Sequence, residues 1–193
     1  MTDFSDIRIG FVMTGSFCTF KKSFLQAENL KKKGAELIPI MSYNASSIDS
    51  RFGTAEENLK ILEDICGRKV ITKIEDAEPI GPKNLADILV VCPCTGNTCA
   101  KLAMSITDAP SLMAVKSHLR NRKPVVIALA SNDSLAGSMK NIAMLMNTKN
   151  YYFVPFYQDD KISKPTSAVC DFTRLEETIM AALEGRQIQP VLC

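Results

Sequence analysis

Residues 87–104, which read DILVVCPCTGNTCAKLAM, determine the expected fold more than any other stretch of the chain. The apolar run 87–92 is continuous rather than alternating, which is typical of a strand covered on both faces, as in a parallel sheet. A polar turn with Gly96 follows this run, and residues 97–104 then have the pattern of a helix. A strand, a turn and a helix in direct succession predict one unit of an alternating α/β fold.

The same alternation recurs along the rest of the chain. The apolar runs that we interpret as strands are 7–13, 36–41, 69–74, 87–92, 124–130 and 151–156. Helical patterns are found at 17–33, 54–66, 97–104, 108–120, 138–147 and from 172 to near 185. We therefore expect one α/β domain over residues 1–193, with a doubly wound parallel sheet of about six strands between two layers of helices.

Two of these helices carry recognisable ends. The residues Thr54-Ala55-Glu56-Glu57 form a capping box, and Gly67 marks the end of the helix that follows. The basic run 31–33 stands just before Gly34, which predicts the last turn of a helix, where cations interact favourably with the helix dipole.

Composition and charge exclude several classes of protein. The chain has 193 residues, of which 46% are hydrophobic and 23% charged, and its net charge is +2, as in an average globular domain. Such a balance disfavours a nucleic-acid-binding or membrane-surface protein. The sequence has no apolar stretch long enough for a membrane span, and residues 1–6 do not resemble a signal peptide. We expect a cytoplasmic protein.

The seven cysteines are scattered, although Cys92, Cys94 and Cys99 lie close together in sequence. Zinc in proteins usually has four Cys or His ligands, often as C-x2-C pairs, and this chain has one His and no such pair. We interpret the cysteines as structural thiols and expect no metal.

Polar residues follow four of the expected strands. In doubly wound sheets, ligands bind outside the carboxyl ends of the strands. Glycine lets the backbone approach a ligand, hydroxyl and N–H groups at a helix start bind phosphate, and an Asn amide both donates to and accepts from a planar heterocycle. Together the loops predict a pocket for a phosphorylated planar ligand. The candidate binding residues are Thr14, Gly15, Ser16, Ser42, Pro93, Thr95, Gly96, Asn97, Thr98, Ser131 and Asn132.

Each of these loops also has a simpler interpretation. Ser16, Ser42, Asn97 and Thr98 are all residue types that cap helices. The first loop has a single glycine where a dinucleotide fingerprint has three, so a mononucleotide fits it better. Asp133 accepts a proton only if its pKa is raised, and it is equally suited to capping the next helix.

Some of the loop motifs resemble a known superfamily. Thr14-Gly15-Ser16, the pattern P-x-T-x-N-T-x-A-K-x-A at 93–103 and the loop that carries Asn132 resemble the flavoproteins related to phosphopantothenoylcysteine decarboxylase, peptidyl-cysteine decarboxylases and flavin prenyltransferase. The resemblance covers about residues 7–145. It implies a Rossmann-like fold and FMN as the cofactor.

A second set of motifs runs nearly from end to end: AEPIGPK at 77–83, PCTGNT at 93–98, KSHLRNRKP at 116–124, SND at 131–133, YFVPF at 152–156, KP at 164–165 and QIQP at 187–190. Together these motifs are similar to those of the dipicolinate synthase B subunits. The resemblance implies an oxidoreductase subunit that takes part, during sporulation, in oxidising a dihydrodipicolinate-type precursor to pyridine-2,6-dicarboxylate. It also implies the A subunit of the synthase as a partner, a nicotinamide nucleotide shared with that partner as the alternative cofactor, and a homo-oligomer, either a trimer or a dodecamer.

The chain departs from the cysteine decarboxylases in two places. Their catalytic His precedes the strand at 87–92, and the corresponding position here is about Pro79. Their P-x-M-N-x-x-M loop reads LASNDSL at 129–135, which keeps only Asn132. Both departures argue against cysteine decarboxylation. We expect the single histidine, His118, to be a surface or interface residue rather than a general base.

The implied dicarboxylate substrate requires cations, for which arginine is better suited than lysine. Arg51 is the first candidate, with a solvated loop arginine as the alternative, and Lys161 and Lys164 are candidates from a later loop. The candidate catalytic residues are then Arg51, Asn97, Asn132 and Asp133. Two other functions stay open: a non-catalytic nucleotide-binding scaffold for the A subunit, and an FMN-dependent decarboxylase.

Overall fold

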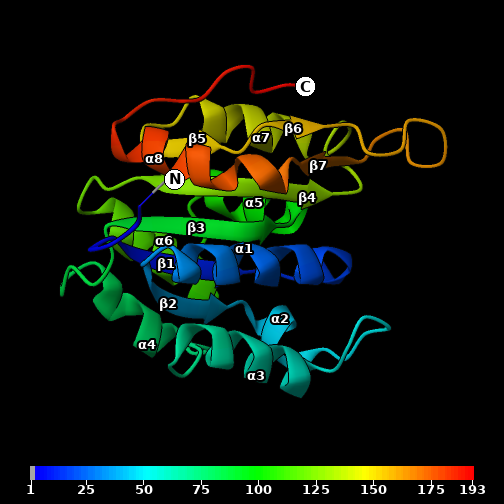
Figure 1. Cartoon of the computed structure of the whole chain (residues 1–193). Helices are drawn as coiled ribbons and strands as arrows, with labels where there is room; N and C mark the ends of the chain where they lie inside the picture. Colours follow the sequence, from blue (N-terminus) through cyan, green and yellow to red (C-terminus); the bar gives the residue numbers. More distant parts are fainter. Residues whose placement is uncertain (1–2) are drawn as a thin grey trace.

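The run that begins at Asp87 forms a central strand, β3 (Ile88–Cys94), every residue of which is buried. A computed structural model describes residues 3–193 and shows one sheet covered by helices on both faces (Figure 1). In these residues the sheet has seven strands in the order β2-β1-β3-β4-β7-β6, and β5 also pairs with β4. The other strands are β1 (Arg8–Met13), β2 (Glu36–Met41), β4 (Val125–Ser131), β5 (Tyr151–Phe153), β6 (Phe156–Tyr157) and β7 (Ala168–Cys170).

Helices cover the sheet because their apolar faces pack on the buried strands. In Figure 1, α1 and α8 lie on the near face of the sheet, and α5 and α6 lie on the far face. The α-helices are α1 (Phe20–Lys32), α2 (Tyr43–Ser47), α3 (Ala55–Cys66), α4 (Ile74–Ala77), α5 (Gly96–Ala103), α6 (Pro110–Leu119), α7 (Met139–Met146) and α8 (Leu175–Leu183). Short 3-10 turns are η1 (Phe17–Thr19), η2 (Glu78–Ile80) and η3 (Phe172–Arg174).

The expected doubly wound α/β architecture is confirmed. Strand β1 lies between β2 and β3 and is parallel to both, so the chain reverses its direction of winding at this point. The helix ends are also as predicted: the capping box at Thr54 is present, Gly67 ends α3 with φ +72°, and Lys31 and Lys32 occupy the last turn of α1.

Two of the predicted strands differ from the prediction. The run 69–74 is not a strand, since only Ile71 bridges to Ile40 and α4 begins at Ile74. The exposed Lys69 and Lys73 make this run too polar for a position covered on both faces. The run 151–156 divides into β5 and β6 near Pro155, which has no N–H for a ladder.

Strand β7 was not expected, and it makes part of the sheet antiparallel. It has three residues and pairs antiparallel with both β4 and β6. The β6–β7 connection projects from the right-hand edge of the sheet in Figure 1, where β4 also ends. A segment outside the parallel core therefore reaches the edge at which the candidate residues lie.

Candidate functional site

The loop after β1 is fastened to the loop after β3 by the buried side chain of Thr14. Its Oγ1 donates to the Pro93 carbonyl at 2.8 Å and accepts from the Thr95 N–H at 3.1 Å. Both hydrogen bonds lie within the chain, so the Thr14 hydroxyl joins the two loops, and its predicted contact with a ligand stays a prediction. Thr14 and the equally buried Pro93 hold the two loops together, and their neighbours Gly15, Ser16 and Thr95 reach the surface.

Beside these loops lies a cleft of about 460 Å³, referred to below as the first cleft. It is bounded by the loop after β1, the turn at Arg51, the end of β4 and the β6–β7 connection. The lining residues are Gly15, Ser16, Phe17, Cys18, Thr19, Arg51, Phe52, Thr95, Ala130, Ser131, Asn132, Asp159, Lys164, Ser167, Ala168 and Val169.

A second cleft, of about 370 Å³, adjoins the first, because Gly15 and Thr95 line both. It lies between the end of β2 and the helices α5 and α6. The other residues that line it are Ser42, Tyr43, Asn44, Asn97, Thr98, Lys101, Asp108, Ala109, Ser111 and Leu112.

The four predicted loops thus meet at one edge of the sheet, in two adjoining clefts rather than in one. Asn132 lies in the first cleft, and Ser42 and Asn97 lie in the second. Ser42 also caps α2 by accepting from the Ala45 N–H at 3.3 Å, which confirms the capping interpretation, and its role in ligand binding stays a prediction. Thr98 likewise lines the second cleft while its N–H donates to the Thr95 hydroxyl at 3.1 Å.

Gly96 lies behind the clefts and has a packing role. A Cβ at this position would stand 2.4 Å from the Ser138 Oγ and 2.7 Å from both the Asp133 Oδ1 and the Ser131 Oγ. The same Asp133 oxygen accepts from Ser131 at 2.6 Å and from Ser138 at 2.9 Å. This network fixes the loop after β4 against the start of α5.

The network also favours the ionised form of Asp133. The hydrogen bonds from Ser131 and Ser138 lower the pKa of this carboxyl, because they stabilise its ionised form. The condition under which Asp133 would accept a proton, a raised pKa, is therefore not met. Its carboxylate holds the loop in place instead.

Gly15 differs from Gly96 because packing does not require a glycine there. A Cβ at Gly15 would have the Asn44 Cβ at 3.6 Å and the Phe17 ring at 3.8 Å, which are ordinary van der Waals contacts. Asn44 lines the second cleft and Phe17 lines the first. The missing side chain therefore leaves open the space in which the two clefts join, as a ligand that extends through both would need.

The first cleft carries two cations and one carboxylate. Arg51 is at the tip of a tight turn closed by hydrogen bonds between Ser50 and Gly53, with its guanidinium 4.8 Å from the centre of the Phe52 ring. Lys164 and Asp159 come from the β6–β7 connection. Lys161 is not among the described residues that line this cleft, so its expected place is corrected.

Part of the site lies on a segment next to β7, which the sequence pattern does not predict. The β6–β7 connection is tied to the loop after β4: the Thr166 hydroxyl donates to the Asn132 carbonyl at 2.7 Å, and the Leu135 N–H donates to the Thr166 carbonyl at 2.9 Å. This brings Asp159 and Ser167 into the first cleft. Asp159 follows β6, which has two residues, and Ser167 precedes β7, which has three, and such strands are too short to show a periodic pattern.

His118 is fully buried, which corrects the expectation of a surface residue. Its Nε2 lies 3.1 Å from the Pro124 carbonyl, and its Nδ1 has no hydrogen-bond partner among residues 3–193. Burial lowers the pKa of His118 to about 4. Since Pro124 precedes β4, this histidine lies at the opposite end of the sheet from the clefts.

The clustered cysteines are buried as well, with the Cys94 and Cys99 sulfur atoms 3.5 Å apart. Burial raises the pKa of the Cys92 thiol to about 12. Within residues 3–193, three or more His, Cys, Asp or Glu side chains nowhere come together as a metal would require, and no helix is long and apolar enough to cross a membrane.

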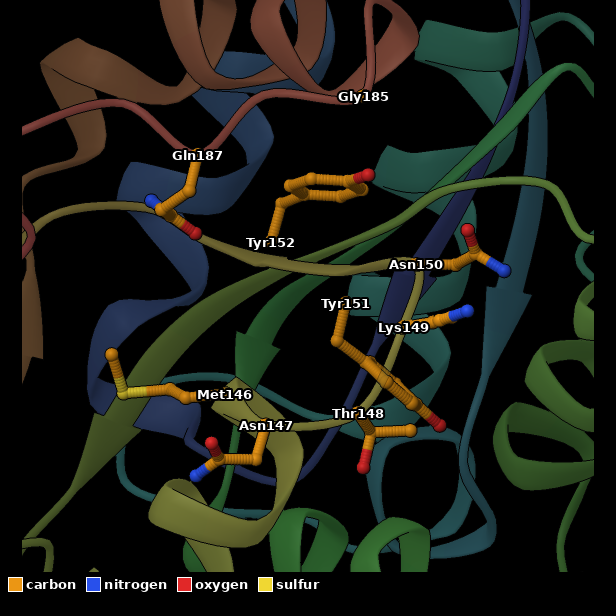
Figure 2. A pocket seen from close by; sticks show the side chains of 9 residues that line it. All are labelled: Met146, Asn147, Thr148, Lys149, Asn150, Tyr151, Tyr152, Gly185 and Gln187. Atoms are coloured by element: carbon orange, nitrogen blue, oxygen red, sulfur yellow. The ribbon is translucent and has the colours of Figure 1, made fainter.

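A further cavity, of about 520 Å³, lies at the amino end of β5 (Figure 2). Met146, Tyr152, Gly185 and Gln187 are among its lining residues, together with the connection from α7 to β5. The predicted site residues lie elsewhere, at the carboxyl ends of the strands. Although larger, this cavity is therefore separate from the candidate site.

Comparisons with known proteins agree with this architecture. The family model described as Flavoprotein matches residues 2–184. The dipicolinate synthase B subunit of Bacillus subtilis (strain 168) is 44% identical over 192 residues, which are 100% of this chain and 96% of that protein. The crystal structure of the dipicolinate synthase B subunit from Bacillus halodurans superposes with a TM-score of 0.91 at 41% identity and covers 100% of this chain and 98% of that one.

The fold is also shared with a more distant structure. The FMN-dependent cysteine decarboxylase SpaF has a TM-score of 0.71 at 21% identity, with 93% of this chain and 98% of that chain covered. At 21% identity this comparison shows a shared fold and nothing further.

Proposed function

Because the chain belongs to the flavoprotein family and, within it, to the dipicolinate synthase B subunits, we propose that it is an FMN-binding subunit of a dipicolinate synthase. With the A subunit, it takes part in oxidising a dihydrodipicolinate-type precursor to pyridine-2,6-dicarboxylate in the cytoplasm of a spore-forming bacterium. Residues 1–193 act as one domain, and the protein assembles into a homo-oligomer, a trimer or a dodecamer.

The observation that carries the FMN assignment is the pair of clefts joined at Gly15. FMN has a flat ring system and a phosphate tail, and each cleft suits one of these parts. Ser42 and Thr98 line the second cleft beside the start of α5, whose first N–H groups have no partner within the helix, so we assign the phosphate there. Ser16, Ser131 and Asn132 would face the ring system in the first cleft.

The protein supplies binding and orientation, while bound FMN would supply a hydride acceptor. Arg51 and Lys164 bind the two carboxylates of the substrate, since both cations line the first cleft. Asn132 orients the heterocycle through its amide in the first cleft, and Asn97 contacts the phosphate end of the cofactor in the second cleft. Asp133 acts through its hold on Ser131 and Ser138, which keeps the loop after β4 in place.

A non-catalytic role is the second candidate. The chain's single histidine lies at the far end of the sheet, and the pKa of Asp133 is lowered, so neither group serves as a general base. In this alternative the clefts hold a nucleotide, either FMN or a nicotinamide nucleotide shared with the A subunit, and the chain positions that partner. A cysteine decarboxylase is disfavoured by Pro79 and by the LASNDSL loop at 129–135.

Reconstitution distinguishes these functions. The purified chain is titrated with FMN, and formation of pyridine-2,6-dicarboxylate is then measured with and without the A subunit. We expect FMN binding and product formation that requires both proteins. If Asn132→Ala leaves turnover of the intact complex unchanged, the scaffold role is the correct one. If the chain binds no flavin, the FMN assignment is wrong.

A further inference from the structure

The second cleft contains an ion pair between Lys101 and Asp108, whereas the other described residues that line it are uncharged. Lys101 Nζ lies 2.7 Å and 2.9 Å from the two carboxylate oxygens of Asp108. Among the described lining residues, Lys101 is the one cation and Asp108 the one anion. While they are paired with each other, the cleft has no net charge to offer a ligand.

The turn that joins Lys101 to Asp108 has backbone hydrogen bonds that do not involve this pair. The turn between α5 and α6 is closed by its own backbone, with the Ile106 N–H donating to the Lys101 carbonyl at 2.8 Å and the Ser105 N–H to the Leu102 carbonyl at 3.1 Å. Asp108 does not cap α6, whose first residue is Pro110 and whose N-cap, Ala109, has no capping side chain. The Asp108 side chain is 55% exposed, and exposed ion pairs contribute little to stability.

Lys101 is well placed to bind an anion in the cleft. Asn97, Thr98 and Lys101 lie on one face of α5, since residues three and four apart are neighbours on a helix. All three line the second cleft opposite Ser42. An ammonium group has three donors, and its hydrogen bonds to a phosphate are charge-assisted, as are those it makes to a carboxylate.

We propose that Lys101 binds the phosphate of the nucleotide, and that Asp108 holds Lys101 at the cleft until the phosphate displaces it. The proposal rests on the proposed function, because it takes FMN as the occupant of the clefts. It adds a specific consequence: Asp108 competes with the phosphate for Lys101. Removing the carboxylate should therefore strengthen phosphate binding, although it breaks an ion pair.

Comparing two flavins tests this assignment. FMN and riboflavin share the ring system, and riboflavin lacks the phosphate. Fluorescence titrations with each flavin are performed on the wild-type chain and on the Lys101→Met, Lys101→Arg and Asp108→Asn variants, with thermal unfolding of every variant as a check on folding. Inorganic phosphate is added to the wild-type chain as a competitor of FMN.

The expected results differ between the variants. Lys101→Met weakens FMN binding about tenfold or more and leaves riboflavin binding unchanged, because one charge-assisted contact to phosphate is lost. Lys101→Arg retains most of the FMN affinity, and Asp108→Asn binds FMN as tightly as the wild type or more tightly. Inorganic phosphate competes with FMN.

Other results overturn the proposal. If Lys101→Met and Asp108→Asn weaken the binding of FMN and the binding of riboflavin equally, the ion pair has a structural role only. If Lys101→Met fails to fold, two other measurements still test the proposal. A loss of FMN affinity in Asp108→Asn overturns the proposal, and so does a failure of inorganic phosphate to compete with FMN in the wild type. If the wild-type chain binds FMN and Lys101→Met has no effect, this inference alone is wrong. If the wild type binds neither flavin, the proposed function fails with it.

Discussion

At Gly15, packing would tolerate a side chain, but the clefts would lose space for a ligand. A methyl group at this position would meet only ordinary contacts, so Gly15→Ala is expected to fold like the wild type. The same methyl group lies where the clefts join, and we expect FMN affinity to fall about tenfold or more. Thermal unfolding and flavin titration measure the two effects separately.

Gly137→Ala is the matched control for this substitution. Gly137 lies in the loop after β4, where a Cβ would be 3.6 Å from the Asp133 Oδ2, and it lines neither cleft. Both variants add one methyl group, so only Gly15→Ala should affect flavin binding. Wild-type FMN affinity in Gly15→Ala would mean that the junction is not occupied.

His118 makes the stability of the protein depend on pH. Its folded-state pKa of about 4 lies below its ordinary value of 6.5, so between these values the unfolded chain binds more protons. The free energy of unfolding should therefore decrease as the pH falls from 6.5 to 4, by a total of about 3 kcal/mol from this residue. Urea unfolding at pH 7 and pH 5 measures the effect, and His118→Gln should have a shallower slope. An equal slope in both proteins would exclude His118 as the cause.

At the edge of strand β5, the side chain of Gln187 supplies hydrogen-bond partners for the backbone of Phe153. The Phe153 N–H donates to the Gln187 Oε1 at 2.7 Å, and the Gln187 Nε2 donates back to the Phe153 carbonyl at 2.7 Å. Figure 2 shows Gln187 beside this strand. We expect Gln187→Ala to lower the free energy of unfolding by about 1–3 kcal/mol, because two backbone groups lose their partners.

Denaturant unfolding tests this role of Gln187. Gln189→Ala is the control, since Gln189 lies two residues further along and does not bond to Phe153. Unfolding midpoints that are the same for both variants would show that solvent satisfies the edge of β5 equally well. FMN binding should be unaffected, because Gln187 lines neither cleft.

The elements predicted from sequence were those with long local patterns. Strands β1 to β4 have continuous apolar runs, and the capping box at Thr54 is complete within four residues. Strand β7, with three residues, has no such pattern. The roles of Thr14 and Asp133 were not predictable either, because they depend on whether a side chain is already hydrogen-bonded. The Thr14 hydroxyl finds its partner 79 residues away, at Pro93.

Across the whole molecule, the first cleft unites segments that are far apart in the chain. Arg51 lies between α2 and α3, and Lys164 comes from the β6–β7 connection. If they bind the two substrate carboxylates, Arg51→Gln and Lys164→Gln should each raise the KM for the dicarboxylate about tenfold or more in the reconstituted complex and leave FMN affinity unchanged.

Lys161→Gln is the control for both variants. Lys161 is an exposed lysine of the same connection as Lys164, yet it is not among the described residues that line the cleft. Steady-state kinetics should give this variant a wild-type KM. A KM that rises equally in all three would indicate a general effect of positive charge rather than two specific contacts.

A crystal structure of the chain soaked or grown with FMN would show directly whether the two clefts hold the cofactor. We expect difference density through both clefts, with the ring system beside Asn132, the phosphate beside Ser42 and Lys101, and the connecting chain passing Gly15. Density for FMN in the cavity near Tyr152, or a phosphate bound beside Asn132 instead, would contradict this expectation.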